Sequence, residues 1–157
     1  DKVQRTTTIH DLLLKEKQPD KYYYGVDHIY YKKLFEEVKS RDTIYQWRRV
    51  YVRENKSNVC PTLTANMGTG GHNVPIVKDD YGIRKLTPEE CARFQGFKNG
   101  EFIRPEKMAN SHLYKQLGNS VVVPVVERIA EEIVRVLDIK YSKDSCAQDA
   151  IQMTAVN

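Results

Sequence analysis

The chain has 157 residues, of which 40% are hydrophobic and 29% are charged, with a net charge of +4 and a pI near 8.9. This composition predicts a soluble globular domain and excludes a chain that is disordered throughout. No apolar run approaches the roughly 20 residues that a membrane-spanning helix needs, and residues 1–5 lack the basic start and apolar centre of a signal peptide. We therefore expect a cytoplasmic protein with no membrane partner.

The three cysteines, Cys60, Cys91 and Cys146, are widely spaced and odd in number. They do not indicate a disulfide framework, and no Cys/His pair has the spacing of zinc ligands. Free thiols and no metal site are expected. The first residue is Asp1 rather than methionine, which favours a cleaved product or an expressed fragment, although processing could also remove an initiator.

The first 40 residues contain two short segments with helical character. One covers residues 9–14, and the other covers residues 31–39, where Leu34, Phe35 and Val38 share a face. Residues 19–20, a Pro-Asp pair, predict a turn between them. Five tyrosines surround the turn and the second segment, and packing is the more natural role for such amphipathic rings than chemistry.

A basic and aromatic segment follows, in which five positive side chains alternate with three aromatic rings. Such a mixture is typical of a surface that meets the phosphates of a nucleic-acid duplex, although a solvated basic loop explains the segment equally well by itself. The side chains are Arg41, Tyr45, Trp47, Arg48, Arg49, Tyr51, Arg53 and Lys56.

Short β-like runs occupy the middle of the chain. They cover residues 50–52, 59–64, 74–77 and 83–86, and Gly-, Asn- and Asp-containing turns separate them. The pattern predicts a small, irregular sheet.

The remainder of the chain is predicted to be helical. Residues 87–90, Thr-Pro-Glu-Glu, form a capping box with proline at the first helical position, so we expect a helix over 88–95 that Gly96 ends. A second helix is expected over 111–117, ended in the same way by Gly118. A third begins near Pro124, with one apolar and one charged side as far as residue 137. Residues 139–157 carry no strong period and are expected to form a tail of low order.

Two stretches resemble the closing motifs of the DNA (cytosine-5)-methyltransferases. Residues 114–121 read Tyr-Lys-Gln-Leu-Gly-Asn-Ser-Val and resemble motif ten, which implies that Asn119, Ser120 and Val121 lie against the methionine end of S-adenosylmethionine. Without the resemblance, residues 118–120 could present backbone N–H groups and two side-chain donors to an anionic ligand, and the alternative is an ordinary helix C-cap followed by a polar turn. Residues 84–93 resemble motif nine, which implies that Arg93 is the structural link of the recognition domain, a role that suits its five donors.

The segment between residues 46 and 71 resembles the two DNA-recognition loops of the same family. In the first loop, Gln46 would fill the gap left by a flipped cytosine and Arg49 would read guanine, with Arg48 beside them. The second loop resembles one in which hydroxyls, an amide and glycines approach DNA closely. A mobile Gly-rich hairpin is the alternative, and a phosphate-binding P-loop is excluded because no Gly-Lys-Ser/Thr follows. The candidate contacts in this loop are Thr62, Thr64, Asn66, Gly68, Gly70 and Gly71.

Cys91 is a candidate nucleophile only by residue type. It lies inside a predicted helix and lacks the preceding proline of the family's catalytic motif, so a buried packing residue is expected. No residue of this chain is assigned a catalytic role.

The resemblance extends over residues 6–137 and implies an α+β fold. A small, irregular, β-rich target recognition domain that includes motif nine would cover residues 1–110, and C-terminal helices would pack on a missing Rossmann-like catalytic domain. Residues 111–138 would be the motif ten segment and 139–157 a flexible tail. The family's Pro-Cys, Glu-Asn-Val and Gly-rich cofactor motifs have no match here, so the chain by itself is expected to be inactive.

The function that the resemblance implies is DNA recognition and completion of the cofactor pocket in an enzyme that methylates cytosine C5. The implied setting is a restriction-modification system in the cytoplasm and nucleoid of a prokaryotic cell. The implied partners are double-stranded DNA and an N-terminal catalytic part or subunit, and a homodimer through the Pro124 helix is expected when the chain is isolated. The alternatives are a non-catalytic DNA-binding module or degenerate fragment, and an interaction protein whose motif matches are accidental.

Overall fold

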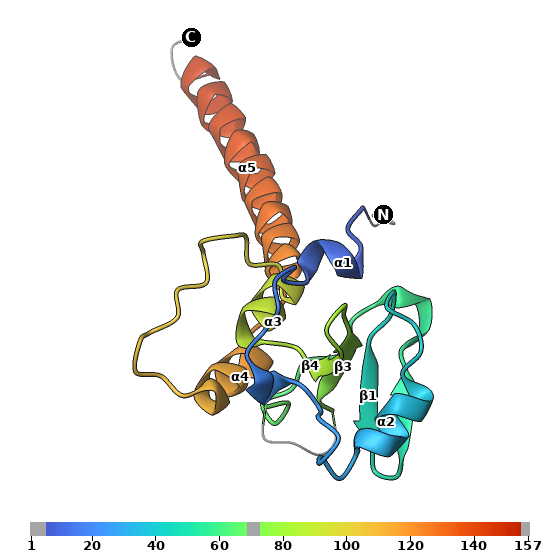
Figure 1. Cartoon of the computed structure of the whole chain (residues 1–157). Helices are drawn as coiled ribbons and strands as arrows, with labels where there is room; N and C mark the ends of the chain where they lie inside the picture. The colour runs from blue at the N-terminus through green and yellow to red at the C-terminus, as the bar shows by residue number, and fades with distance from the viewer. Residues whose placement is uncertain (1–5, 69–72, 155–157) are drawn as a thin grey trace. The chain divides into compact units, whose positions relative to one another are not determined.

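The computed structural model describes residues 6–68 and 73–154, with the side chains of Ser57 and of residues 140–154 left aside (Figure 1). The chain divides into two compact units, residues 1–120 and 121–157. The expected division precedes residue 111, whereas the observed one follows Ser120, because the helix between them packs on its predecessor in the first unit.

A four-stranded antiparallel sheet forms the centre of the first unit, with the strand order β2-β1-β3-β4. Together with the helices it gives the mixed α and β architecture that the sequence predicts. The strands are β1 (Tyr45–Arg48), β2 (Tyr51–Glu54), β3 (Pro75–Lys78) and β4 (Ile83–Lys85).

Three of the four predicted β runs are confirmed as β2, β3 and β4, but the run over residues 59–64 is wrong. A short 3-10 helix, Lys56–Asn58, precedes it, and the chain then continues as a loop. Pro61 has no N–H to give to a strand ladder, which opposes pairing in this segment. The place beside β3 belongs instead to β1, which was expected to be a recognition loop.

The two faces of the sheet differ in chemistry. Tyr45, Trp47, Val52 and Ile76 lie on one face, since directly paired residues of an antiparallel sheet share a face. Helix α2 (Tyr31–Glu37) packs on the β1–β2 side of the sheet and contributes the buried Leu34 to this apolar cluster (Figure 1). The other face of β1 carries polar residues, which are described below.

A second core cluster forms between the sheet and three further helices, α1 (Ile9–Leu12), α3 (Pro88–Phe94) and α4 (Asn110–Asn119). The predicted helices at 9–14, 31–39 and 88–95 are confirmed, and so is the turn after Pro19, where the 3-10 helix Asp20–Tyr22 begins. This cluster joins α3 and α4 to the loop that leads into the sheet, and its central side chains are Met67, Cys91, Tyr114 and Leu117.

The start of α3 follows the sequence prediction in detail. The Thr87 hydroxyl accepts from the Glu90 N–H at 3.2 Å, and the Glu90 carboxylate accepts from the Thr87 N–H at 2.8 Å. Gly96 has φ of 93°, as a left-handed helix end requires. Cys91 is fully buried with its sulfur 4.0 Å from that of Met67, and burial raises the pKa of its thiol well above the ordinary value. Cys91 is therefore a packing residue, as expected.

Gly118 does not end the helix in which it lies. Helix α4 continues to Asn119, and the extended residue Ser120 ends it. A Cβ at Gly118 would lie only 2.1 Å from the carbonyl carbon of Thr64. The glycine is thus required by close packing against a neighbouring loop instead of by a left-handed turn.

A buried ion network joins β4 to α3. The Arg84 guanidinium donates to both carboxylate oxygens of Glu90 at 2.8 Å and to Asp79 at 2.5 Å. Glu90 also accepts from the backbone N–H of Leu14 at 2.9 Å. Arg93, the expected link, instead donates to Glu89 one turn earlier on α3. Arg84 therefore makes the multiple contacts that the sequence interpretation gave to Arg93.

The second unit consists of helix α5, Val123–Thr154. It begins where predicted and continues past residue 137 to Thr154, and the low order expected for residues 139–157 stays a prediction. No glycine or proline follows Pro124, and the local sequence therefore offers no helix breaker. Apolar side chains on α5 are exposed, among them Ile129 at 56%, Ile133 at 55% and Leu137 at 44%. In the described part of the chain, no helix combines the length and apolarity of a membrane span.

Candidate nucleic-acid interface

A cleft of about 340 Å³ lies on the polar face of the β1–β2 hairpin. It brings together four residues that the sequence assigned to DNA contact: Gln46, Arg48, Thr62 and Thr64. We call it the recognition cleft, and its lining residues are Gln46, Arg48, Arg53, Asn55, Cys60, Pro61, Thr62, Thr64 and Asn73.

Strand alternation places Gln46 in this cleft. Gln46 pairs directly with Arg53, whereas its neighbours Tyr45 and Trp47 point to the apolar cluster on the other face. Gln46 is only 4% exposed, and Arg53 is exposed. The glutamine is therefore an inner lining residue and does not project as a tip, so a base edge would have to enter the cleft to meet it.

The tip of the hairpin is a two-residue turn, Arg49-Val50, between β1 and β2. Arg49 has φ of 52°, in the left-handed region, and its side chain is exposed. The carbonyl of Val50 accepts a hydrogen bond from Lys33 of α2, which fastens the turn. Arg49 lines a second hollow of about 470 Å³ with Arg48, Tyr51 and Asn73. The predicted guanine-reading residue is thus at the most protruding part of the hairpin.

Arg48 belongs to both hollows and donates a hydrogen bond to the Asn73 side chain. Among the described residues that line the two hollows, none is acidic. The Cys60 thiol is neutral, since burial raises its pKa to about 12. The recognition cleft therefore carries the positive Arg48 and Arg53 with no carboxylate among its described lining residues, which favours a polyanionic ligand.

The second predicted loop forms the other wall of the recognition cleft. Thr62 is exposed, but the Thr64 hydroxyl is buried and, within residues 6–68 and 73–154, makes no hydrogen bond. A buried hydroxyl without a partner costs about 1–3 kcal/mol. Asn66 is exposed but does not line the cleft, and Gly68 packs under the Tyr114 ring. Gly70 and Gly71 lie outside the described residues.

The motif ten residues lie at the end of α4. The Ser120 hydroxyl donates to the Leu117 carbonyl at 2.7 Å, and the Ser120 N–H bonds to the same oxygen at 3.3 Å. Gly118 and Asn119 are helical, so the expected turn of available N–H groups is wrong here. The exposed Asn119 amide both donates and accepts, which fits the ammonium and carboxylate of an amino-acid end. Val121 is 61% exposed and belongs to the second unit.

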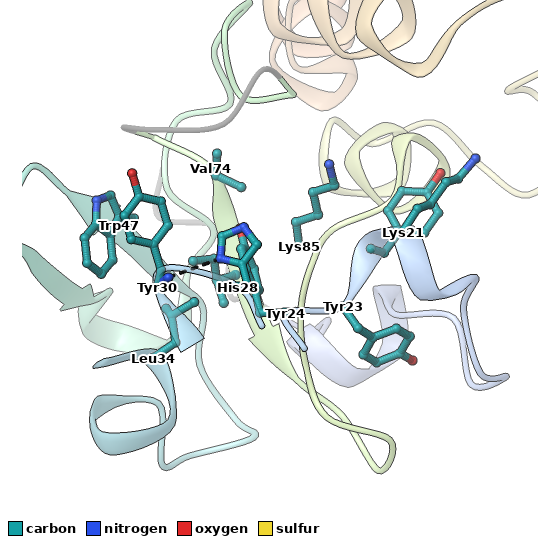
Figure 2. A pocket seen from close by; sticks show the side chains of 11 residues that line it. Lys21, Tyr23, Tyr24, His28, Tyr30, Leu34, Trp47, Val74 and Lys85 are labelled. Atoms are coloured by element: carbon teal, nitrogen blue, oxygen red, sulfur yellow. Dashed lines mark hydrogen bonds between the residues drawn. The ribbon is translucent and has the colours of Figure 1, made fainter. Parts of the chain in front are cut away.

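An aromatic pocket of about 130 Å³ lies on the opposite face of the sheet (Figure 2). Tyr30 stacks on Trp47 with ring centroids 4.2 Å apart, and His28 meets Tyr24 edge-on at 4.8 Å. Burial raises the pKa of Tyr24 to about 12. These rings support strand β1 from behind, so the expected packing role is confirmed for Tyr24 and Tyr30.

Sequence reasoning named Arg53 only as part of the basic and aromatic segment and Arg84 only as part of motif nine, and it missed Asn55 and Asn73. Alternation along a correctly predicted β1–β2 hairpin would have identified Arg53, because it lies opposite Gln46. Asn73 carries no local signal, since its partner Arg48 lies 25 residues earlier in the chain. The partners of Arg84, Asp79 and Glu90, are five and six residues away, but the sequence pattern did not pair them. Among the described residues, no group of three or more His, Cys, Asp or Glu side chains could hold a metal ion.

Comparison with known proteins adds a sequence match and a fold match. The sequence profile of the C-5 cytosine-specific DNA methylase family matches residues 1–135. Type II methyltransferase M.Bsp6I of Bacillus sp. (strain RFL6) is 63% identical over 132 residues, which cover 83% of this chain and 41% of the relative. Type II methyltransferase M.SsoII of Shigella sonnei is 42% identical over 77 residues, or 49% of this chain and 20% of the relative.

The crystal structure of S. pombe Dnmt2 methyltransferase resembles this chain in fold. The TM-score is 0.62 at 18% identity, over 87% of this chain and 44% of that one. The chain therefore spans less than half the length of each of these proteins.

Proposed function

The chain belongs to the C-5 cytosine-specific DNA methylase family, and on this premise we propose that it is the DNA-recognition and cofactor-pocket-completing portion of a DNA (cytosine-5)-methyltransferase. The whole enzyme would transfer a methyl group from S-adenosylmethionine to cytosine C5 in a specific duplex sequence. The names of the type II relatives favour a restriction-modification system. The observation that carries the proposal is the recognition cleft, which joins predicted DNA contacts from two loops.

The β1–β2 hairpin is the element that would enter the major groove, which admits a two-stranded ribbon. Arg49 at its tip and Arg48 beside it would present guanidinium forks to the O6 and N7 acceptors of guanine. Arg53 and Thr62, both exposed at the cleft, suit contacts to phosphate oxygens, which position the duplex without reading it. The inner amide of Gln46 would meet the edge of a base that enters the cleft.

Cofactor binding would use the end of α4. S-adenosylmethionine supplies the methyl group when it is bound, and Asn119 would hold its amino-acid end through the exposed amide. Ser120 would act indirectly, because its hydroxyl is hydrogen-bonded to Leu117 and fixes the last turn.

The catalytic nucleophile and carboxylate would come from an N-terminal part that this chain does not include, since it covers 41% of M.Bsp6I. The buried Cys91 is unsuited to the task because its thiol is kept neutral. We propose that the apolar side of α5 packs on that part. Burying each large side chain would contribute about 1.5–3 kcal/mol.

A chimera tests the proposal. Residues 1–135 of this chain replace the matching region of M.Bsp6I, and transfer of a radiolabelled methyl group from S-adenosylmethionine to duplex DNA is measured. We expect methylation by the chimera and none by this chain alone. A folded chimera that binds DNA but does not methylate would favour the alternative, a non-catalytic DNA-binding module. A folded chimera that does not bind DNA would refute both.

A further inference from the structure

Two glycine contacts join the second recognition loop, residues 61–68, to helix α4. A Cβ at Gly118 would lie 2.1 Å from the carbonyl carbon of Thr64 and 2.3 Å from the amide nitrogen of Ala65. A Cβ at Gly68 would lie 2.2 Å from Cδ2 of Tyr114. Real Cβ atoms essentially never approach other atoms this closely, so loop and helix are in direct contact at both points.

The Thr64–Gly118 contact lies between the two proposed binding sites. On one side of it, Thr64 lines the recognition cleft, and on the other side, Asn119 follows Gly118 at the exposed end of α4. The helix is anchored between them, because the Tyr114 hydroxyl donates to the Leu86 carbonyl at 2.5 Å and the Gln95 amide donates to the Leu117 carbonyl at 3.0 Å. A displacement of the loop would therefore change the contact between Thr64 and Gly118 and shift the last turn of α4, where Asn119 lies.

The loop has a chemical reason to move when DNA binds. The Thr64 hydroxyl lies at the recognition cleft, and within the described residues it has no hydrogen-bond partner, although such groups are nearly always paired. A small shift that exposes it would let it bond to DNA. The Thr64 backbone contacts Gly118, so the same shift would press on or release α4.

We propose that Gly118 and the Gly68–Tyr114 contact are a positioning device that couples DNA binding in the recognition cleft to S-adenosylmethionine binding at Asn119. The proposal rests on the function proposed above and adds a route between its two sites. Because coupling is reciprocal, the bound cofactor changes DNA affinity by the same factor as bound DNA changes cofactor affinity.

The first test places a methyl group in the recognition loop and reads the result at the cofactor. In the chimera with M.Bsp6I, the affinity for S-adenosylhomocysteine is measured by calorimetry without DNA. We expect Gly68→Ala to weaken it about fivefold or more, within the usual range of coupling between sites. The control is Gly25→Ala, since a Cβ there meets nothing within 4 Å and should change nothing. A folded Gly68→Ala variant with unchanged cofactor affinity would overturn the proposal.

The second test uses Thr64→Val, which keeps the side-chain shape and removes a hydroxyl that has no partner in the described structure. If Gly68→Ala fails to fold, this variant still tests whether the two binding sites are coupled through the loop. We expect unchanged affinity for S-adenosylhomocysteine without DNA. We also expect that the duplex substrate, which changes this affinity in the parent chimera, no longer changes it in Thr64→Val. If DNA shifts cofactor affinity in this variant as in the parent, the coupling does not run through the loop. Failure of the proposed function is distinguishable, because the unmutated chimera would then not methylate the duplex, whereas failure of the coupling alone leaves that methylation intact.

Discussion

Arg84 and Glu90 show how single residues hold the first unit together. Both side chains are fully buried. The Glu90 carboxylate accepts hydrogen bonds from the Arg84 guanidinium and from the backbone N–H groups of Thr87 and Leu14. Removing one member of such a pair leaves an uncompensated charge in the interior. Burial by itself would lower the pKa of Arg84, but the hydrogen bonds and charges of Glu90 and Asp79 outweigh it and raise the pKa.

Glu90→Gln should lower the free energy of unfolding by about 3–5 kcal/mol, the usual effect of breaking a buried pair. Urea denaturation of the 157-residue chain measures it. Glu89→Gln is the matched control on the same helix, since the Glu89 side chain is 50% exposed in its pair with Arg93. It should cost less than about 1 kcal/mol. Equal effects of the two substitutions would contradict the assigned role of the buried network.

Asp79 predicts a pH dependence of stability. Burial would raise its pKa, but the hydrogen bonds from Arg84, Tyr81 and Tyr23 outweigh this, so the folded-state pKa lies below the ordinary value of 3.8. A lowered folded pKa means that the carboxylate stabilises the fold above pH 3.8 and that this contribution is lost as the pH falls further. Asp79→Asn should therefore be less stable at neutral pH and should lose less stability on acidification. Urea denaturation at pH 3 and pH 6 tests this, and parallel losses in both proteins would exclude it.

At the scale of elements, adjacent residues of strand β1 point to opposite faces of the sheet, one apolar and one polar. Trp47 is held by Tyr30 and the apolar cluster, while Gln46 and Arg48 face the recognition cleft. Because the side-chain period of a strand is two, a shift of one residue in register would bury the arginine and expose the tryptophan. The aromatic pocket behind the strand therefore fixes which side chains face the recognition cleft.

Arg53→Ala should weaken binding of the chimera to duplex DNA by a similar factor for all DNA sequences. It should also reduce the slope of log affinity against log salt concentration by about 0.9, the value expected for loss of one phosphate contact. Fluorescence anisotropy at several salt concentrations measures both. Arg41→Ala is the control, because Arg41 lies in the same basic segment but pairs with Asp80. An unchanged slope for Arg53→Ala, or an equal change for both variants, would remove Arg53 from the interface.

At the scale of the whole molecule, the chain has a packed unit and an uncovered helix. The first unit contains its own core clusters, whereas α5 exposes Ile129, Ile133 and Leu137. An apolar stripe of this kind is typical of a surface that binds another protein surface.

Ile133→Glu should weaken association of this chain with the N-terminal part of M.Bsp6I supplied as a separate polypeptide. The expected change is about 10- to 150-fold in affinity, which corresponds to the roughly 1.5–3 kcal/mol of burying one large aliphatic side chain. Analytical ultracentrifugation measures the association. Glu131→Gln changes a charged position of the same helix and should have little effect. Undiminished association of the Ile133→Glu variant would place the contact elsewhere.

The sequence by itself determined the features that depend on near neighbours. The capping box of residues 87–90 and the start of α5 follow from contacts within a few positions, and both are confirmed. The resemblance to the DNA (cytosine-5)-methyltransferases could also be recognised from the sequence, because residues 84–93 and 114–121 are contiguous motifs. The tertiary structure decided what depends on distant partners. Strand β1 pairs with β3 some thirty residues later, and Gly118 is required by the backbone of Thr64, which lies in another loop. Burial and strand pairing are properties of the assembled fold, so no local pattern specified them.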